Sequence, residues 1–177
     1  MKSVKISKLD AAKRQLETAI RLYFSNGDPV SIHTLTAAAY NILKDLNKQR
    51  GMPPMLVKEQ LLIYVREKKL KEFKEIINKA ENFFKHADRD HEATIDFCPD
   101  LSDVFILDAC ETYYKLSGEF PPLFKLYQGW FMANNEHLFN LPDDLSMSIK
   151  LAKSGVIGLG REGYFNNVLP ILMRFKT

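Results

Sequence analysis

The sequence predicts an all-α fold, a single-domain bundle of about six to eight helices spanning residues 1–177. Apolar residues recur at spacings of three and four in residues 7–26, 29–49 and 69–87, and this spacing is typical of helices with one buried face. The link between the first two segments is very short, which favours an antiparallel helical hairpin. With 46% hydrophobic and 27% charged residues, the chain has the balance of one globular domain.

The first predicted helix, residues 7–26, presents one continuous apolar face. That face comprises Leu9, Ala12, Leu16, Ala19, Ile20, Tyr23 and Phe24. In the stretch "SNGDP" that follows, Gly27 suits the left-handed conformation after a helix, Asp28 an N-cap and Pro29 a first helical position. One helix therefore ends and the next begins almost at once.

The second predicted helix, residues 29–49, carries apolar or small side chains on two faces. One face comprises Ile32, Leu35, Ala38, Ala39, Ile42, Leu43 and Leu46. The other contains His33, Ala37, Tyr40 and Lys44. A helix of this kind is typical of the centre of a bundle. Gly51 and the two prolines after it end the helix.

The next stretch, "MLVKEQLLIYVREKKL", is predicted to be helical, although "LLIYV" also fits a short strand. The clearest apolar period in the chain follows in residues 69–87, and we expect this helix to pack against the hairpin. Its apolar residues are Leu70, Phe73, Ile76, Ile77, Ala80, Phe83, Phe84 and Ala87. The stretch "DRDHEATIDFCPD" then breaks the period and predicts a loop.

Further helices complete the predicted bundle. One covers residues 101–117 and ends at Gly118, and the next begins with two prolines, where a first turn tolerates them. A shorter helix follows "LPDD", and the apolar tail is interrupted by Pro170. Because the aromatic residues of this half fall at helical spacing, we expect core packing rather than stacking on nucleobases. They are Phe120, Phe124, Tyr127, Trp130 and Phe131.

Charge is distributed unevenly along the chain. Residues 1–85 carry 17 Lys/Arg against 9 Asp/Glu, and residues 86–177 carry 8 against 13. The basic half can attract phosphate, or it can face the acidic half of its own chain or of a second subunit. No apolar run approaches the roughly 18 residues of a membrane span. The N-terminal stretch has no apolar leader region, and Cys98 and Cys110 make no CxxC pair, so the predicted compartment is the cytoplasm.

Two motif matches do not predict a bound cofactor. "GLGREG", residues 158–163, matches GxGxxG but lacks the surrounding βαβ unit, so we expect a flexible loop and no dinucleotide. Residues 88–99 resemble an EF-hand loop but carry Ala93 and Pro99 where Gly and Glu are needed. A looser divalent-metal site built from His86, Asp90 and His91 stays open.

Polar residues mark the outer face of the helix predicted at 69–87. At helical spacing, Asn82 and His86 lie one turn apart beside Glu75 and Lys79, away from the apolar stripe. His86 is therefore not expected in the core. It points either into solvent or into a surface covered by another molecule.

The stretch "ENFFKH", residues 81–86, resembles a motif of the HEPN superfamily of helical-bundle proteins. Members of that family often carry an Arg, then a polar residue such as Asn, then three residues and a His late in a long helix, and they dimerise so that two motifs line an RNA-cutting cleft. Asn82 and His86 match the second and last positions, whereas Glu81 occupies the Arg position. The chain is also similar to bacterial all-α proteins to which the family assigns no activity.

The resemblance implies a metal-independent ribonuclease with His86 and Asn82 as catalytic residues, RNA as substrate and a homodimer as the active form. Since Glu81 would repel a phosphate, Lys85 and Arg89 are the candidates to bind it, and Glu81→Arg is expected to raise cleavage. His86 would act as general acid or base.

Three functions are compatible with the sequence. The first is a partner-binding or structural helical bundle without a metal or cofactor, and the second is the ribonuclease. The third is a metal-dependent enzyme using His33, His86 and a carboxylate. Self-association is predicted through the helix faces that carry His33, Tyr40, Asn82 and His86, since these faces lie off the main apolar stripes.

Overall fold

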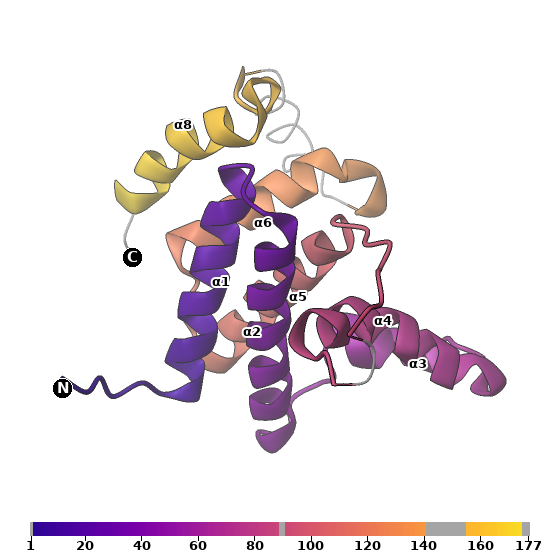
Figure 1. The fold of residues 1–177 in the computed structure, drawn as a ribbon. Helices are drawn as coiled ribbons and strands as arrows, with labels where there is room; N and C mark the ends of the chain where they lie inside the picture. Colours follow the sequence, from indigo (N-terminus) through magenta and orange to yellow (C-terminus); the bar gives the residue numbers. More distant parts are fainter. Residues whose placement is uncertain (1, 89–90, 141–154, 175–177) are drawn as a thin grey trace.

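The computed structural model describes residues 2–88, 91–140 and 155–174. These residues contain seven α-helices and no strand, so the predicted all-α bundle is confirmed (Figure 1). The hairpin of α1 (Lys8–Phe24) and α2 (Pro29–Gln49) lies in front of α5 (Leu101–Ser117) and α6 (Pro122–Asn134) in this view, and α8 (Gly160–Arg174) crosses one end. None of the helices in these ranges combines the length and apolar character that crossing a bilayer requires.

The link between α1 and α2 has the predicted stop and start, with one difference. The Asp28 side chain caps α2 by accepting a hydrogen bond from the Ser31 backbone N–H at 2.7 Å. The residue with positive φ is Asn26, at 51°, and not Gly27. Gly27 is needed for space instead, because a Cβ there would lie 3.1 Å from the backbone oxygen of Leu22.

The central position predicted for α2 is confirmed, since it packs against α1, α4 (Leu70–Lys85) and α5. Its deepest face is the one that carries histidine and tyrosine rather than the leucine-rich face. The buried residues of α2 are Ile32, His33, Thr36, Ala37, Ala39, Tyr40, Leu43 and Asn47.

An aromatic cluster joins α1, α6 and α8. The ring of Phe24 stacks on that of Tyr164 at 6.0 Å and meets the edges of Tyr127 and Trp130 at 6.3 and 5.8 Å. The core prediction is confirmed for Phe124, Tyr127, Trp130 and Phe131, which are all buried, whereas Phe120 is only partly buried.

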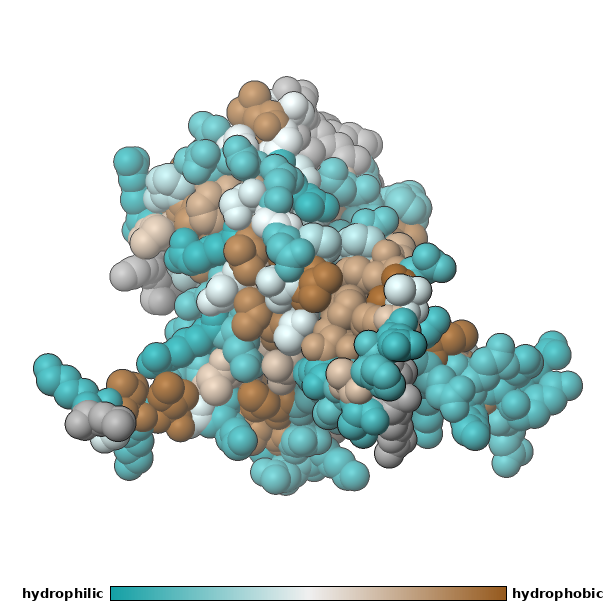
Figure 2. All heavy atoms as spheres, in the orientation of Figure 1, coloured by the Kyte–Doolittle hydropathy of each residue, from teal (hydrophilic) through white to brown (hydrophobic). Residues whose placement is uncertain are grey.

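Residues 55–70 form short helical pieces and no strand. A π-helical turn, η1 (Leu56–Gln60), leads into α3 (Leu61–Ile63) and a 3-10 turn, η2 (Glu67–Lys69). The following α4 has its buried residues, Ile77, Ala80 and Glu81, in its second half. α3 and the first half of α4 therefore project from the bundle as an arm (Figure 1). Hydrophilic residues cover most of this arm on the face shown in Figure 2.

The remaining elements confirm most of the predicted boundaries. The described part of residues 86–100 is a loop, and Gly118 ends α5 with φ at 74°. The predicted flexible loop at residues 158–163 is wrong, because a 3-10 turn ends at Leu159 and α8 begins at Gly160. Tertiary contacts explain this difference, since Arg161 and Tyr164 both pack on α1. The helix expected after "LPDD" lies outside the described residues.

Candidate functional site

Asn82 and His86 lie in one groove. Both side chains are exposed, and the His86 backbone N–H donates to the Asn82 carbonyl at 3.1 Å as the last bond of α4. The groove has a volume of about 630 Å³ and runs between α4 and the loop that follows it. It is lined by Glu75, Lys79, Asn82, Phe83, His86, Asp88, Ala93 and Thr94. The expectation that His86 lies outside the core is therefore confirmed.

Glu81 points the other way, into the protein. Its carboxylate lies 2.5 Å from the ammonium of Lys58 and 2.7 Å from that of Lys85, and it also accepts a hydrogen bond from the Asn41 amide. The Lys58 and Glu81 side chains are 7% and 9% exposed. Burial by itself raises the pKa of Glu81, but the two lysines outweigh it and the pKa is lowered. Burial also lowers the pKa of Lys58.

The orientation of Glu81 changes the interpretation of the motif. Glu81 does not line the groove, so it does not repel a phosphate bound there. An arginine at position 81 would lie beside Lys58 and Lys85 instead of reaching the groove, so the expected gain from Glu81→Arg does not follow. Lys85, expected to bind phosphate, is 31% exposed and is held by Glu81. Arg89 lies outside the described residues.

Lys79 is the described cation that does line the groove. The sequence contained a signal for it, since Lys79 lies on the same face of α4 as Asn82 and His86. Two carboxylates, Glu75 and Asp88, share the groove with it. The described part of the groove therefore carries more negative than positive charge.

The expectation that His33 and Tyr40 lie on a free face is wrong, because both are buried under α5. The Tyr40 hydroxyl donates to Asp108 at 2.7 Å, and the same carboxylate oxygen accepts from the Val57 N–H at 3.0 Å. The Lys58 N–H donates to the Tyr40 hydroxyl at 3.2 Å. These bonds fix the π-helical turn η1 against α2 and α5.

His33 joins three parts of the chain. Its Nδ1 lies 3.0 Å from the Ser102 hydroxyl, and its ring meets the edges of Phe84, Phe97 and Phe105 at 5.9, 5.1 and 6.1 Å. Its Nε2 has no hydrogen-bond partner in the described structure. Burial lowers the pKa of His33. His33 is thus a packing residue between α2, α4, α5 and the loop after α4.

The third hypothesis required His33 and His86 to share a metal with a carboxylate. In the described ranges, no group of three His, Cys, Asp or Glu side chains is placed to hold a metal ion. His33 is buried, whereas His86 is exposed in the groove. Asp90, part of the looser divalent-metal site, is not among the described residues.

A second candidate site, which the sequence did not predict, surrounds Asp103 at the first turn of α5. The Asp103 carboxylate accepts a hydrogen bond from the Tyr23 hydroxyl at 3.2 Å, and Trp130 Nε1 donates to the same hydroxyl at 3.1 Å. The guanidinium of Arg161 lies 3.9 Å from the centre of the Tyr23 ring. Burial raises the pKa of Asp103 to about 6 and that of Tyr23 to about 12.

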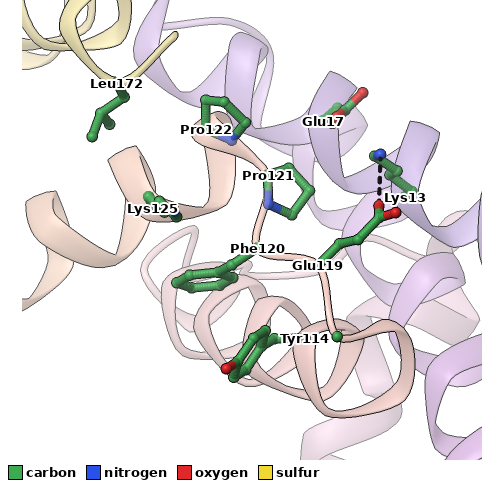
Figure 3. Close-up of a pocket in the computed structure, with 10 residues that line it drawn as sticks. Lys13, Glu17, Tyr114, Glu119, Phe120, Pro121, Pro122, Lys125 and Leu172 are labelled. Atoms are coloured by element: carbon green, nitrogen blue, oxygen red, sulfur yellow. Dashed lines mark ion pairs between the residues drawn. The ribbon is translucent and has the colours of Figure 1, made fainter. Parts of the chain in front are cut away.

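A third cavity, of about 630 Å³, lies where α5 meets α6 (Figure 3). Lys13 of α1 approaches Glu119 to 3.6 Å across its rim, and the rings of Tyr114 and Phe120 lie 5.4 Å apart. Its Lys13 cation is thus already paired with a carboxylate, and the cavity gives less support to a ligand site than the other two.

No protein-family model, curated protein or solved structure matches this chain significantly. The groove and the Asp103 cavity are therefore the features of the molecule that indicate its function.

Proposed function

We propose that this protein is a partner-binding helical bundle of the cytoplasm that associates with a second copy of itself through the outer face of α4. The main support is Ile76, which is 59% exposed and lies two turns before the groove residue Phe83 on the same edge of the helix. Ile76 of one copy can enter the groove of the other beside Phe83. The cytoplasm fits the two free cysteines, Cys98 and Cys110.

The two ends of α4 have opposite charge. Residues 66–74 contain five Lys/Arg and two Asp/Glu, whereas residues 86–100 contain one Arg and five Asp/Glu. The helix has 16 residues, so its ends are about 24 Å apart. In an antiparallel pair, the basic end of each α4 would lie beside the acidic loop of the other copy. In a dimer with two-fold symmetry, this contact between a basic end and an acidic loop occurs twice.

Sedimentation velocity at protein concentrations from about 1 to 100 µM tests this association, because dimers are favoured by concentration. We expect a shift from a 20.4 kDa species towards twice that mass. Ile76→Asp should abolish the shift. Ile171→Asp, at a residue of α8 that is 52% exposed, is the matched control and should leave the shift unchanged. A monomer at all concentrations would contradict the proposal.

Charge reversal tests the antiparallel arrangement separately. Lys71→Glu and Asp96→Lys should each weaken the dimer, and the double variant should recover it, because an opposite-sign pair is restored. Raising the salt concentration to about 1 M should also weaken it, since the Debye length falls to about 3 Å. If the double variant does not recover dimer formation, the copies associate through another surface or in another orientation.

The second candidate function is a metal-independent ribonuclease with catalytic His86 and Asn82, and the observation that favours it is that both line one groove with Lys79. His86 would move the proton, Asn82 would hold the substrate, and Lys79 would be the described cation nearest to them along the helix face. The excess of carboxylates in the groove places this function second.

Incubation with single-stranded RNA of mixed sequence tests the ribonuclease, with and without a chelator. We expect cleavage that persists with chelator, is lost in His86→Ala and is kept in His137→Ala, which changes an exposed histidine outside the groove. Loss of cleavage with chelator would point to a metal-dependent reaction. No cleavage by the wild-type protein would exclude the ribonuclease and leave the self-association proposal untouched.

A further inference from the structure

Asp103 and Arg161 face the same cavity without pairing with each other. The cavity has a volume of about 390 Å³, and both side chains line it together with Tyr23. Arg161 forms no ion pair with any carboxylate in the described ranges. Opposite charges that share a partly buried cavity attract each other strongly, so their separation leaves each of them undercompensated.

The two charges are held in place by their neighbours. The guanidinium of Arg161 rests on the Tyr23 ring, a cation–π contact that fixes its plane. One oxygen of Asp103 accepts a hydrogen bond from the Tyr23 hydroxyl. Among the described side chains, Tyr23 alone donates to this carboxylate, and it bonds Oδ2, which leaves Oδ1 to accept a hydrogen bond from a ligand. A second carboxylate, Asp100, also lines the cavity.

The rest of the cavity wall is largely apolar. It is formed by Val104, Trp130, Phe131 and Leu138, with the amides of Asn134 and Asn135 at one side. Each amide nitrogen uses one of its two N–H groups, since Asn134 and Asn135 donate to the carbonyls of Trp130 and Phe131 at 2.8 and 2.9 Å. The second N–H and the oxygen of each amide remain to bond a ligand. Apolar walls with a few convergent polar groups are typical of small-molecule sites.

We propose that this cavity binds a free α-amino acid with an apolar side chain, its ammonium on Asp103, its carboxylate on Arg161 and its side chain against Trp130 and Phe131. An α-amino acid carries its ammonium and its carboxylate on the same carbon, so a single ligand can compensate Asp103 and Arg161 at once. An amine without a carboxylate leaves Arg161 unpaired, and an acid without an ammonium leaves Asp103 unpaired. The cavity should therefore discriminate against both.

Isothermal titration with L-phenylalanine tests this site, with phenethylamine and 3-phenylpropionate as analogues that each lack one charge. We expect saturable binding of L-phenylalanine that is at least about tenfold tighter than that of either analogue, since losing a charged hydrogen bond costs at least about 1.4 kcal/mol. Asp103→Asn and Arg161→Gln should each weaken the binding of L-phenylalanine by about the same factor. Asp45→Asn and Arg174→Gln, at exposed residues of α2 and α8, are the matched controls and should leave it unchanged.

Binding should also depend on pH, since protonation of Asp103 near pH 6 removes the partner of the ammonium. Affinity should therefore fall as the pH is lowered through this value in the wild type, and the profile should be flat in Asp103→Asn. Absence of saturable binding of L-phenylalanine and L-leucine at millimolar concentrations would overturn the proposal. So would equal binding of L-phenylalanine and phenethylamine, because the carboxylate would then have no role.

Discussion

The ammonium of Lys58 lies 2.5 Å from the carboxylate of Glu81, and this buried contact joins the turn η1 to α4. The same turn is held to α2 and α5 through Tyr40 and Asp108. A polar network therefore anchors the projecting arm to the bundle. The Glu81 position, which resembles an RNA-binding motif position in the sequence, has a structural role in the protein.

Removing Glu81 should destabilise the protein. In Glu81→Ala the buried Lys58 loses its partner, and breaking a buried pair in this way costs about 3–5 kcal/mol. Glu81→Arg should be at least as destabilising, because it adds a third cation. Chemical denaturation measures both effects. Glu72→Ala, which breaks the exposed pair of Glu72 with Lys69, is the control and should change stability by about 0.5 kcal/mol or less.

Replacing both buried charges should be far less harmful than replacing one. The double variant Lys58→Met with Glu81→Leu removes the pair without leaving a buried charge, and such replacements are often neutral. We expect its free energy of unfolding to lie close to that of the wild type. A double variant as unstable as Glu81→Ala would mean that the hydrogen bonds to Asn41 and Lys85 dominate instead.

The burial of His33 predicts a loss of stability in mild acid. Its folded-state pKa is lowered, so the unfolded chain takes up the proton first as the pH falls below about 6.5. The contribution of neutral His33 to the free energy of unfolding is thus complete above this pH and is lost progressively as the pH falls below it. Glu81 opposes the lowering, whereas Lys58 and Lys85 reinforce it. The difference in melting temperature between wild type and His33→Gln, followed between about pH 8 and 5, isolates this effect.

Asp103→Asn should have the opposite dependence on pH. The folded-state pKa of Asp103 is raised from 3.8 to about 6, so the carboxylate destabilises the fold above this pH and the cost disappears as the pH falls towards 3.8. The substitution should therefore stabilise the protein by about 1–2 kcal/mol near pH 8 and have little effect near pH 4. Thermal unfolding at both values measures it. Equal effects at the two values would show that the carboxylate is not the cause.

His86→Ala and Asn82→Ala should leave the melting temperature almost unchanged. Both residues are exposed on the outer face of α4, and surface substitutions usually change stability by about 0.5 kcal/mol or less. Differential scanning calorimetry checks this. A large loss would show that the two side chains support the loop after α4, and variants of the groove could then not separate function from folding.

Periodicity predicted the helices well because apolar residues at helical spacing mark the buried side of each helix. It also placed Asn82 and His86 on the outside of α4, since the angle between residues on a helix follows from their spacing alone. It could not predict that Glu81, next to Asn82, turns inward. That orientation depends on Lys58, which lies in a separate element and supplies the compensating charge.

Two other features depend on contacts between distant parts of the chain. His33 is buried because α5 covers it; the two-faced pattern of α2 indicated a central helix but not which element would cover this face. The Asp103 cavity combines residues from α1, α5, α6 and α8, each of which is ordinary in its own segment. Sequence spacing describes single helices, so a site assembled from four of them left no local signal.

The stacking of Phe24 on Tyr164 also has a consequence for biosynthesis. The hairpin of α1 and α2 joins neighbouring segments and can form as soon as both have left the ribosome. Residue 164 is synthesised much later. The Phe24 ring therefore lacks its stacking partner, Tyr164, while the intervening helices are synthesised. The aromatic cluster around Phe24 is therefore completed only when α8 has been synthesised and packs against α1.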